Sequence, residues 1–161
     1  MASVFTAARA GMTYLPPLHT AEEDVAYFSE QVVGAAGMSL VVAESESESE
    51  SESDGAVAGF AAVSEGWLHH LYVLPSRQGQ GIGSALLDWA KLVSPAGLLL
   101  WVFEENVGAR RHYGRSGFVE VERTDGSRNM EGVPDIRMQW TPPTPPTPPT
   151  AAGSDDVTPI S

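Results

Sequence analysis

The sequence contains no cysteine and few basic residues. Without Cys in its 161 residues, the chain cannot form a disulfide framework, a zinc–cysteine site or a cysteine nucleophile. Its 9 Lys and Arg stand against 21 Asp and Glu, for a formal net charge of −12, whereas nucleic-acid binding needs clustered basic side chains. The same shortage disfavours an anionic membrane surface as partner. Composition therefore argues against both nucleic acid and membrane.

Long hydrophobic runs are also missing. The longest one, Leu98 to Phe103, is far too short to cross a bilayer. The N-terminus lacks the basic and then apolar pattern of a secretory signal. We therefore expect a cytoplasmic protein, with room in its length for one ordinary domain.

The negative charge is concentrated in one stretch. Residues 44–54 alternate Glu with Ser, end at Asp54 and carry six of the net negative charges. Such a segment repels itself and has nothing to bury, which predicts a disordered acidic loop at the tip of a β-hairpin. Residues 141–161 begin with three Thr-Pro-Pro repeats, which predicts a disordered Pro-rich tail. The folded domain would then span residues 1–140.

The rest of the chain alternates helical and strand patterns. Thr20-Ala-Glu-Glu23 is a capping-box pattern, which predicts a helix to about Val33 with Val25, Phe28 and Val32 on its apolar face. The continuous apolar run at 98–103 is typical of a strand buried on both faces. Further strands are predicted at 39–43, 56–63, 67–74, 118–122 and 135–140, and further helices at 84–93 and from Asn106 to Gly117. This order predicts an α/β fold with a mixed sheet flanked by helices.

A glycine-rich segment at residues 78–83, Gln-Gly-Gln-Gly-Ile-Gly, lies between a predicted strand and a predicted helix. Glycine lets the backbone approach a ligand, and the helix start offers unpaired N–H groups, so the segment suits a phosphate or pyrophosphate. A P-loop is excluded because no Gly-Lys-Ser/Thr follows. A dinucleotide loop fits Gly79 and Gly81 but meets Ser84 at its third glycine position. The pattern Gln78-x-x-Gly81-x-Gly83 matches a loop that binds the pyrophosphate of coenzyme A.

Two further segments match proteins that carry this coenzyme A-binding loop. They are the strand at residues 70–75, His-Leu-Tyr-Val-Leu-Pro, and the pattern Asn106-x-x-Ala109-x-x-x-Tyr113-x-x-x-Gly117-Phe118. Over residues 67–118 the chain resembles the GNAT acetyltransferase superfamily. The resemblance implies a mixed, mostly antiparallel sheet with splayed central strands. It also implies acetyl transfer from acetyl-CoA to a primary amine, by direct attack in a ternary complex.

The resemblance assigns roles to individual residues. It makes Tyr113 the general acid that protonates the departing thiolate; the alternative is a core aromatic whose hydroxyl reaches the surface. Asn106 would contact the cofactor or merely cap its helix. The backbone of the strand would hold the pantetheine arm and polarise the thioester carbonyl. The implied cofactor-binding residues are Leu71, Tyr72, Val73, Gln78, Gly79, Gln80, Gly81, Ile82, Gly83, Ser84, Asn106 and Ala109.

The base that deprotonates the amine would lie on the same strand. Relatives often place a Glu where this chain has His69, and His70 follows it. Neighbours on a strand point to opposite faces, so one of the two histidines at most faces the acceptor. An imidazole titrates near neutrality and suits the role. Water-mediated deprotonation is the alternative.

The acceptor site is expected between the N-terminal helices and the last hairpin. Candidate residues there are Tyr14, Leu15, Pro16, His19, Trp67, Asp125, Glu131 and Asp135. Only about a dozen residues precede Tyr14, so the N-terminal strand that relatives have is missing or replaced. A partner subunit could cover that gap, which makes a homodimer an open expectation.

Three functions remain in competition at this point. The first is an N-acetyltransferase for a small-molecule or protein amine, working without a metal. The second is a non-catalytic acyl-CoA-binding or regulatory module on the same fold. The third is a dinucleotide-binding protein, which some 140 folded residues leave little room to build.

Overall fold

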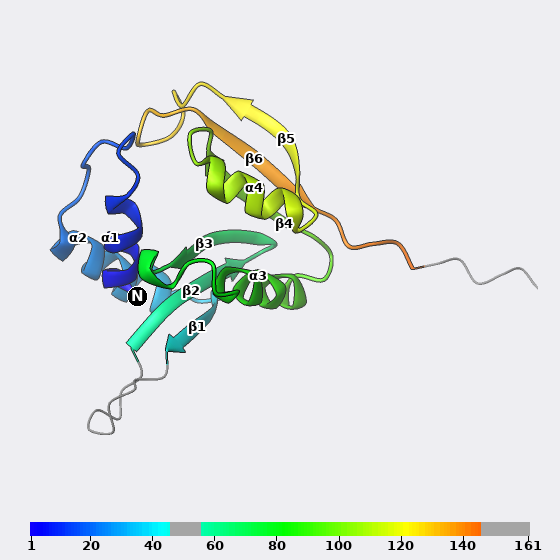
Figure 1. Ribbon diagram of the computed structural model, residues 1–161, viewed down its shortest axis with the longest axis horizontal. Helices are drawn as coiled ribbons and strands as arrows, with labels where there is room; N and C mark the ends of the chain where they lie inside the picture. Colours follow the sequence, from blue (N-terminus) through cyan, green and yellow to red (C-terminus); the bar gives the residue numbers. More distant parts are fainter. Residues whose placement is uncertain (46–55, 146–161) are drawn as a thin grey trace, which may run out of the picture.

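A single six-stranded sheet forms the centre of the molecule, in the order β1-β2-β3-β4-β6-β5. The computed structural model describes residues 1–45 and 56–145 (Figure 1). All neighbouring strands are antiparallel except β3 and β4, which are parallel. This confirms the predicted mixed, mostly antiparallel α/β fold. The strands are β1 (Ser39–Ser45), β2 (Ala56–Ser64), β3 (Trp67–Val73), β4 (Leu98–Phe103), β5 (Val119–Thr124) and β6 (Asp135–Trp140).

The sheet is divided between β3 and β4. These two strands share one residue pair, Trp67 with Leu99, at the point where both strands begin. Beyond that pair they are not joined by ladder pairing, whereas β4 and β6 pair along their whole length. The sheet therefore consists of two halves, β1–β3 and β4–β6–β5, seen as two groups of strands in Figure 1.

Helices cover the first half on both faces. On one face lie α1 (Ala2–Ala10), α2 (Ala21–Tyr27) and a π-helical turn, η1 (Phe28–Val33). They build a buried cluster in which Val4, Phe28 and Phe60 are at most 2% exposed. On the other face α3 (Ile82–Val93) packs through Leu86, Leu87 and Ala90. The helix α4 (Val107–Arg115) contributes to this second cluster through Tyr113.

Local sequence signals explain several helix boundaries. The Thr20 hydroxyl accepts a hydrogen bond from the Glu23 backbone N–H, and the Glu23 carboxylate accepts one from the Thr20 backbone N–H. The predicted capping box is thus present. Asn106 caps α4 by accepting from the Ala109 N–H, and Gly117 adopts a φ of +89° just beyond the helix.

The structure corrects three expectations. Val25 is 54% exposed instead of buried, because no residue of α2 is buried and the buried face begins only at Phe28 of η1. Strand β4 is buried on one face: Leu98, Leu100 and Val102 point inward while Trp101 is 43% exposed, since no described helix covers its other face. Glu44 and Ser45 belong to β1 rather than to the predicted acidic loop.

The remaining parts of the predicted loop and tail, residues 46–54 and 146–161, lie outside the described residues. The expected hairpin is present, because β1 and β2 pair antiparallel on either side of that loop. The first element among the described residues is the helix α1, and no strand precedes β1 there. Within residues 1–45 and 56–145, no helix combines the length and apolarity that crossing a membrane requires.

Candidate active site

The gap between β3 and β4 gives the candidate site its frame. Past the pair of Trp67 with Leu99, the edges of the two strands that face each other have no strand partner. Leu71, Tyr72 and Val73 form the part of β3 that borders this gap. Unpaired backbone N–H and C=O groups in such a gap can bind an extended ligand as a sheet binds an added strand.

The glycine-rich loop closes the open end of this gap. It follows β3 through a short 3-10 turn, η2 (Pro75–Arg77), and leads into the first turn of α3. Gly79 and Gly81 have φ values of +76° and +84°, and a Cβ at either position would meet no atom within 4 Å. Glycine is therefore required there by backbone conformation and leaves open space in front of α3. No side chain caps the N-terminus of α3, so its first N–H groups are available to an anion.

Other loop residues take definite positions. The Gln78 side chain donates a hydrogen bond to the Val73 carbonyl, 3.4 Å away, which ties the loop to the end of β3. Gly83 lies in the first turn of α3, and a Cβ there would touch Val73 and the His112 ring. Gln80 and Ser84 are exposed, while Ile82 packs against the core of the domain.

Tyr113 lies in the buried cluster that spans the gap. That cluster also contains Val73 of β3 and Val102 of β4. The Tyr113 ring contacts Phe118 and is 8% exposed, and its hydroxyl forms no hydrogen bond with another described residue. Burial, and to a smaller extent the nearby Tyr72, raise the pKa of Tyr113 well above its usual value. The phenol therefore stays protonated at neutral pH.

The two histidines of β3 have contrasting surroundings. The register with β2 shifts here: Ala62 pairs with His70 and Val63 with Leu68, which leaves His69 as the extra residue of a β-bulge. His69 is exposed, and its Nε2 lies 2.8 Å from the Ser64 hydroxyl in a hydrogen bond. The bulge puts Leu68 and Leu71 into one buried cluster, while His70 turns to the opposite face.

His70 is enclosed by aromatic rings. The five rings around it have centroids 5.3 to 6.5 Å away, and the nearest belongs to Phe28. Its Nε2 forms a 3.3 Å hydrogen bond with the Tyr27 hydroxyl, while its buried Nδ1 has no partner among the described residues. Burial, with a smaller contribution from the neighbouring His69, lowers the pKa of His70 to about 4. At neutral pH this imidazole is neutral and weakly basic.

The N-terminal segment bridges the two halves on the face that carries His70. The Tyr14 ring contacts Phe103 at the end of β4, with centroids 6.0 Å apart. Arg9 of α1 forms a 3.2 Å ion pair with Glu131 in the β5–β6 loop. Burial raises the pKa of Tyr72 to about 12, with smaller electrostatic contributions from Arg9, Glu131 and Tyr14 among its neighbours. These residues thus surround one side of the gap.

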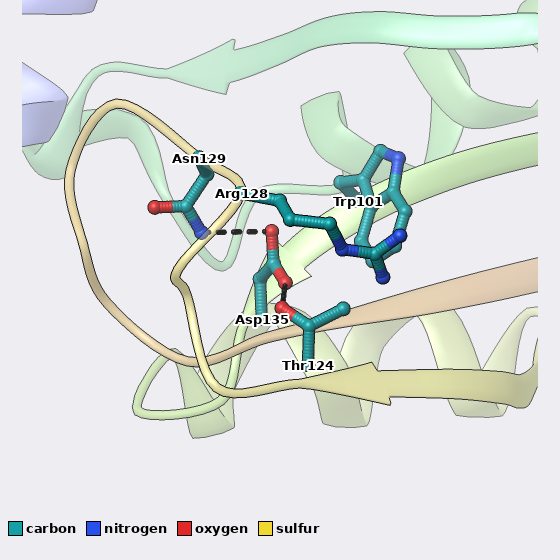
Figure 2. A pocket seen from close by; sticks show the side chains of 5 residues that line it. All are labelled: Trp101, Thr124, Arg128, Asn129 and Asp135. Atoms are coloured by element: carbon teal, nitrogen blue, oxygen red, sulfur yellow. Dashed lines mark hydrogen bonds between the residues drawn. The ribbon is translucent and has the colours of Figure 1, made fainter.

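A cavity of about 310 Å³ lies beside this bridge, on the uncovered face of the second half (Figure 2). It is bounded by the exposed Trp101 and by the β5–β6 loop. Asp135 accepts hydrogen bonds from the Thr124 hydroxyl and from the Asn129 amide. Figure 2 shows Arg128 and Trp101 together at one end, with Asp135 between Thr124 and Asn129 at the other. The cavity is lined by Trp101, Thr124, Arg128, Asn129 and Asp135.

The structure brings together only part of the predicted acceptor set. Tyr14 and Glu131 lie near the gap, and Asp135 lines the cavity. Trp67 lies where β3 and β4 meet, so it is at the closed end. The Asp125 side chain accepts from the Ser127 N–H within its own turn. None of the described contacts joins Leu15, Pro16 or His19 to the gap or the cavity.

Comparison with known proteins identifies the fold. The model of the acetyltransferase (GNAT) domain matches residues 20–120. The chain belongs to the GNAT acetyltransferase family. A curated relative, the uncharacterized N-acetyltransferase MJ1207 of Methanocaldococcus jannaschii, is 34% identical over a stretch that covers 45% of this chain and 39% of the relative. The matched part is thus well under half of that relative.

Solved structures agree with this fold at low sequence identity. The chain is similar to apo YjaB of Escherichia coli, with a TM-score of 0.66, 19% identity, and coverage of 89% of this chain and 90% of YjaB. It is also similar to PH1933 of Pyrococcus horikoshii, with a TM-score of 0.64, 21% identity, and coverage of 89% and 88%. Nourseothricin acetyltransferase matches with a TM-score of 0.57 and 24% identity, over 67% of both chains.

GNAT proteins use acetyl-CoA as acyl donor, and the residues of this chain fit that molecule. The left-handed glycines leave open space before the uncapped start of α3, as a diphosphate needs. On the side of β3 that borders the gap, the backbone of Leu71 and the N–H of Val73 have no strand partner and can receive a pantetheine arm. Asn106 holds the start of α4 with one amide oxygen, and Ala109 lies in the same first turn.

Sequence reasoning missed three residues of the site. Arg9 sits in a helix that has no marked periodicity, and nothing local predicts its pairing with Glu131, 122 residues away. Trp101 was missed because the apolar run at 98–103 predicted a strand buried on both faces, which would leave no exposed side chain to line a site. Arg128 lies in the hairpin segment expected to form the acceptor site, where only the acidic residues were singled out; its positive charge in that segment was the available signal.

Proposed function

We propose that this GNAT protein transfers an acetyl group from acetyl-CoA to a primary amine, directly and within a ternary complex. The gap between β3 and β4, with the glycine-rich loop at its open end and Tyr113 buried beside it, is the observation that supports this most strongly. The backbone N–H groups of Leu71 and Val73, which alternate with the residues bonded to β2, would bind the arm and polarise the thioester carbonyl.

Tyr113 is the proposed general acid. When the amine nitrogen bonds to the carbonyl carbon and the carbon–sulfur bond breaks, the thiolate needs a proton, and the Tyr113 hydroxyl supplies it. The raised pKa of Tyr113 supports this role, because the phenol carries its proton at neutral pH. Because the Tyr113 hydroxyl bonds to none of the described residues, it would be available to the sulfur.

His69 is the better of the two candidates for the base. The pKa of about 4 makes His70 a weak base, and its ring is occupied by Tyr27 and the surrounding aromatic side chains. His69 is exposed and bonded to Ser64. His69→Ala should lower kcat at pH 7 by about 10- to 100-fold, because a positioned base is lost. The loss should shrink as the pH approaches the pKa of the amine, which then deprotonates unaided. A pH–rate profile checks this; a loss that is constant with pH contradicts it.

Tyr113→Phe tests the proposed chemistry. With a panel of primary amines, thiol release should fall at least about 100-fold, because the proton donor is removed while the ring remains. The thermal shift given by acetyl-CoA should be retained, since binding stabilises the fold independently of turnover.

The outcomes separate the competing functions. Unchanged thiol release by Tyr113→Phe at saturating substrate would show that the assigned acid is wrong. Binding of acetyl-CoA by the unsubstituted chain without transfer to any amine would favour a non-catalytic module. A larger thermal shift with NAD than with acetyl-CoA would favour a dinucleotide-binding protein.

A further inference from the structure

The cavity on the uncovered face of the second half has the size of a small-molecule site. Its volume of about 310 Å³ lies at the lower end of the range of roughly 300–1,000 Å³ found for ligand pockets. It opens on the face of β4 that carries Trp101 and Phe103, and Phe103 contacts Tyr14 at the open end of the gap. A molecule in the cavity would therefore lie next to the proposed transfer site.

A row of side chains across the sheet holds more hydrogen-bond donors than acceptors. Trp101 pairs with Arg137 in the β4–β6 ladder, and Arg137 pairs with Glu122 in the β5–β6 ladder. One Glu122 oxygen accepts a hydrogen bond from Arg128 at 2.9 Å, and the other forms an ion pair with Arg137 at 3.2 Å. The buried Nε of Arg137 has no partner among the described residues. One carboxylate thus serves two guanidinium groups.

Arg128 has most of its donors free. Of its nitrogen atoms only one is bonded to a described residue, and its side chain is 71% exposed. A guanidinium offers a planar fork that matches a carboxylate, so this end of the cavity is suited to an anionic group. The neighbouring indole of Trp101 offers apolar surface to the carbon skeleton of a ligand.

The loop that carries Arg128 is held in place at its other end. Asn129 donates to the Val133 carbonyl at 2.8 Å and to Asp135 at 3.0 Å, and it accepts from the Gly132 N–H. Both Asp135 oxygens are thereby engaged, one by Thr124 and one by Asn129. The cavity therefore has the Arg128 guanidinium at one end and the Asp135 carboxyl group at the other (Figure 2). This charge pattern matches a small zwitterion better than a simple cation.

We propose that the acceptor is a small amino acid-like molecule: a primary amine that also carries a carboxylate, which binds Arg128 beside Trp101. The inference rests on the proposed acetyl transfer and specifies its acceptor. It predicts that the carboxylate, not the amine alone, selects the substrate.

Matched sets of acceptors test this proposal. Phenylalanine, leucine and lysine are each compared with the carboxamide and with the decarboxylated amine, using kcat/KM at saturating acetyl-CoA. The unsubstituted protein should prefer the carboxylate member of at least one set by about tenfold, the modest effect expected of an exposed charged hydrogen bond. Arg128→Gln should abolish that preference, Arg128→Lys should retain part of it, and Arg115→Gln, on α4, serves as the matched control.

A second measurement does not depend on acetyl-CoA. The indole N–H signal of Trp101, assigned with Trp101→Phe, should shift on titration with the carboxylate member and much less with the decarboxylated amine. In Arg128→Gln this difference should disappear.

Several results would overturn the proposal. They are equal or better use of the decarboxylated amines in every set, an equal loss for all three members in Arg128→Gln, or an unperturbed Trp101 signal. If acetyl-CoA does not bind and no amine is acetylated, the proposed function fails, while the Trp101 titration still decides whether the cavity takes a carboxylate.

Discussion

The strands before the gap and the strands after it differ in how their faces are covered. β1–β3 are packed between α1 and η1 on one face and α3 on the other, with Phe28 and Phe60 at most 2% exposed. β4 and β6 are buried on one face, β5 has no buried residue, and Trp101 on the other face of β4 is 43% exposed. The first half thus contributes buried core from both faces, whereas the second half contributes core from one face, with Leu98, Leu100 and Ile136 at most 1% exposed. We propose that the other face of the second half serves acceptor recognition.

Replacing one large aromatic residue in each half should give the largest difference in stability between the two halves. Phe28→Ala should lower the free energy of unfolding by about 3–5 kcal/mol, because it leaves a cavity in a buried cluster. Trp101→Ala should cost less than about 1 kcal/mol, because its ring already meets solvent. Urea unfolding monitored by circular dichroism measures both values. Similar losses in the two variants would contradict the division of roles.

The pH dependence of stability should come from the first half, through His70. The pKa of His70 falls from about 6.5 in the unfolded chain to about 4 in the folded protein, so the unfolded state binds the proton first. Stability is therefore complete above about pH 6.5 and declines as the pH falls toward 4, by about 3 kcal/mol in total. Unfolding curves of His70→Gln should lack this part of the decline.

The matched control is His19→Gln, which changes an exposed histidine outside the aromatic cluster. It should leave the decline between pH 6.5 and 4 as it is. An unaltered pH profile in His70→Gln would mean that the buried imidazole does not govern acid stability.

The two helix caps provide the smallest and most selective comparison. Thr20→Ala in the first half and Asn106→Ala in the second should each cost about 1 kcal/mol, since each removes an N-cap hydrogen bond. Only Asn106→Ala should also weaken acetyl-CoA binding, measured by titration calorimetry, if the residue contacts the cofactor. Equal affinities of the two variants for acetyl-CoA would show that Asn106 only caps α4.

Features that follow from local chemistry were predictable from the sequence. The capping box at Thr20, the cap at Asn106 and the helix end at Gly117 depend on neighbouring residues, and all three are present. The glycines at 79 and 81 are in the left-handed conformation that their loop requires. Their proposed contacts with acetyl-CoA stay predictions, as do the roles of Tyr113 and the two histidines.

Features that depend on distant packing were not predictable in the same way. Val25 fits the helical spacing, but its exposure depends on the placement of α2, which contributes no residue to the core. Trp101 extends an apolar run, yet whether a strand is covered on one face or two is decided by helices elsewhere in the chain. The pocket around Arg128 depends on the register that aligns β4, β6 and β5, which no single segment encodes.

The single residue pair between β3 and β4 also affects how the amides of the sheet exchange with solvent. In a continuous sheet the central strands exchange their amide protons slowest, because both neighbours must separate first. Here the central strands have one free edge each beyond Trp67 and Leu99. Their amides that face the gap can lose protection without any strand being pulled apart. In a deuterium-exchange experiment, the gap-facing amides of the central strands β3 and β4 would exchange about as fast as those of the edge strands β1 and β5.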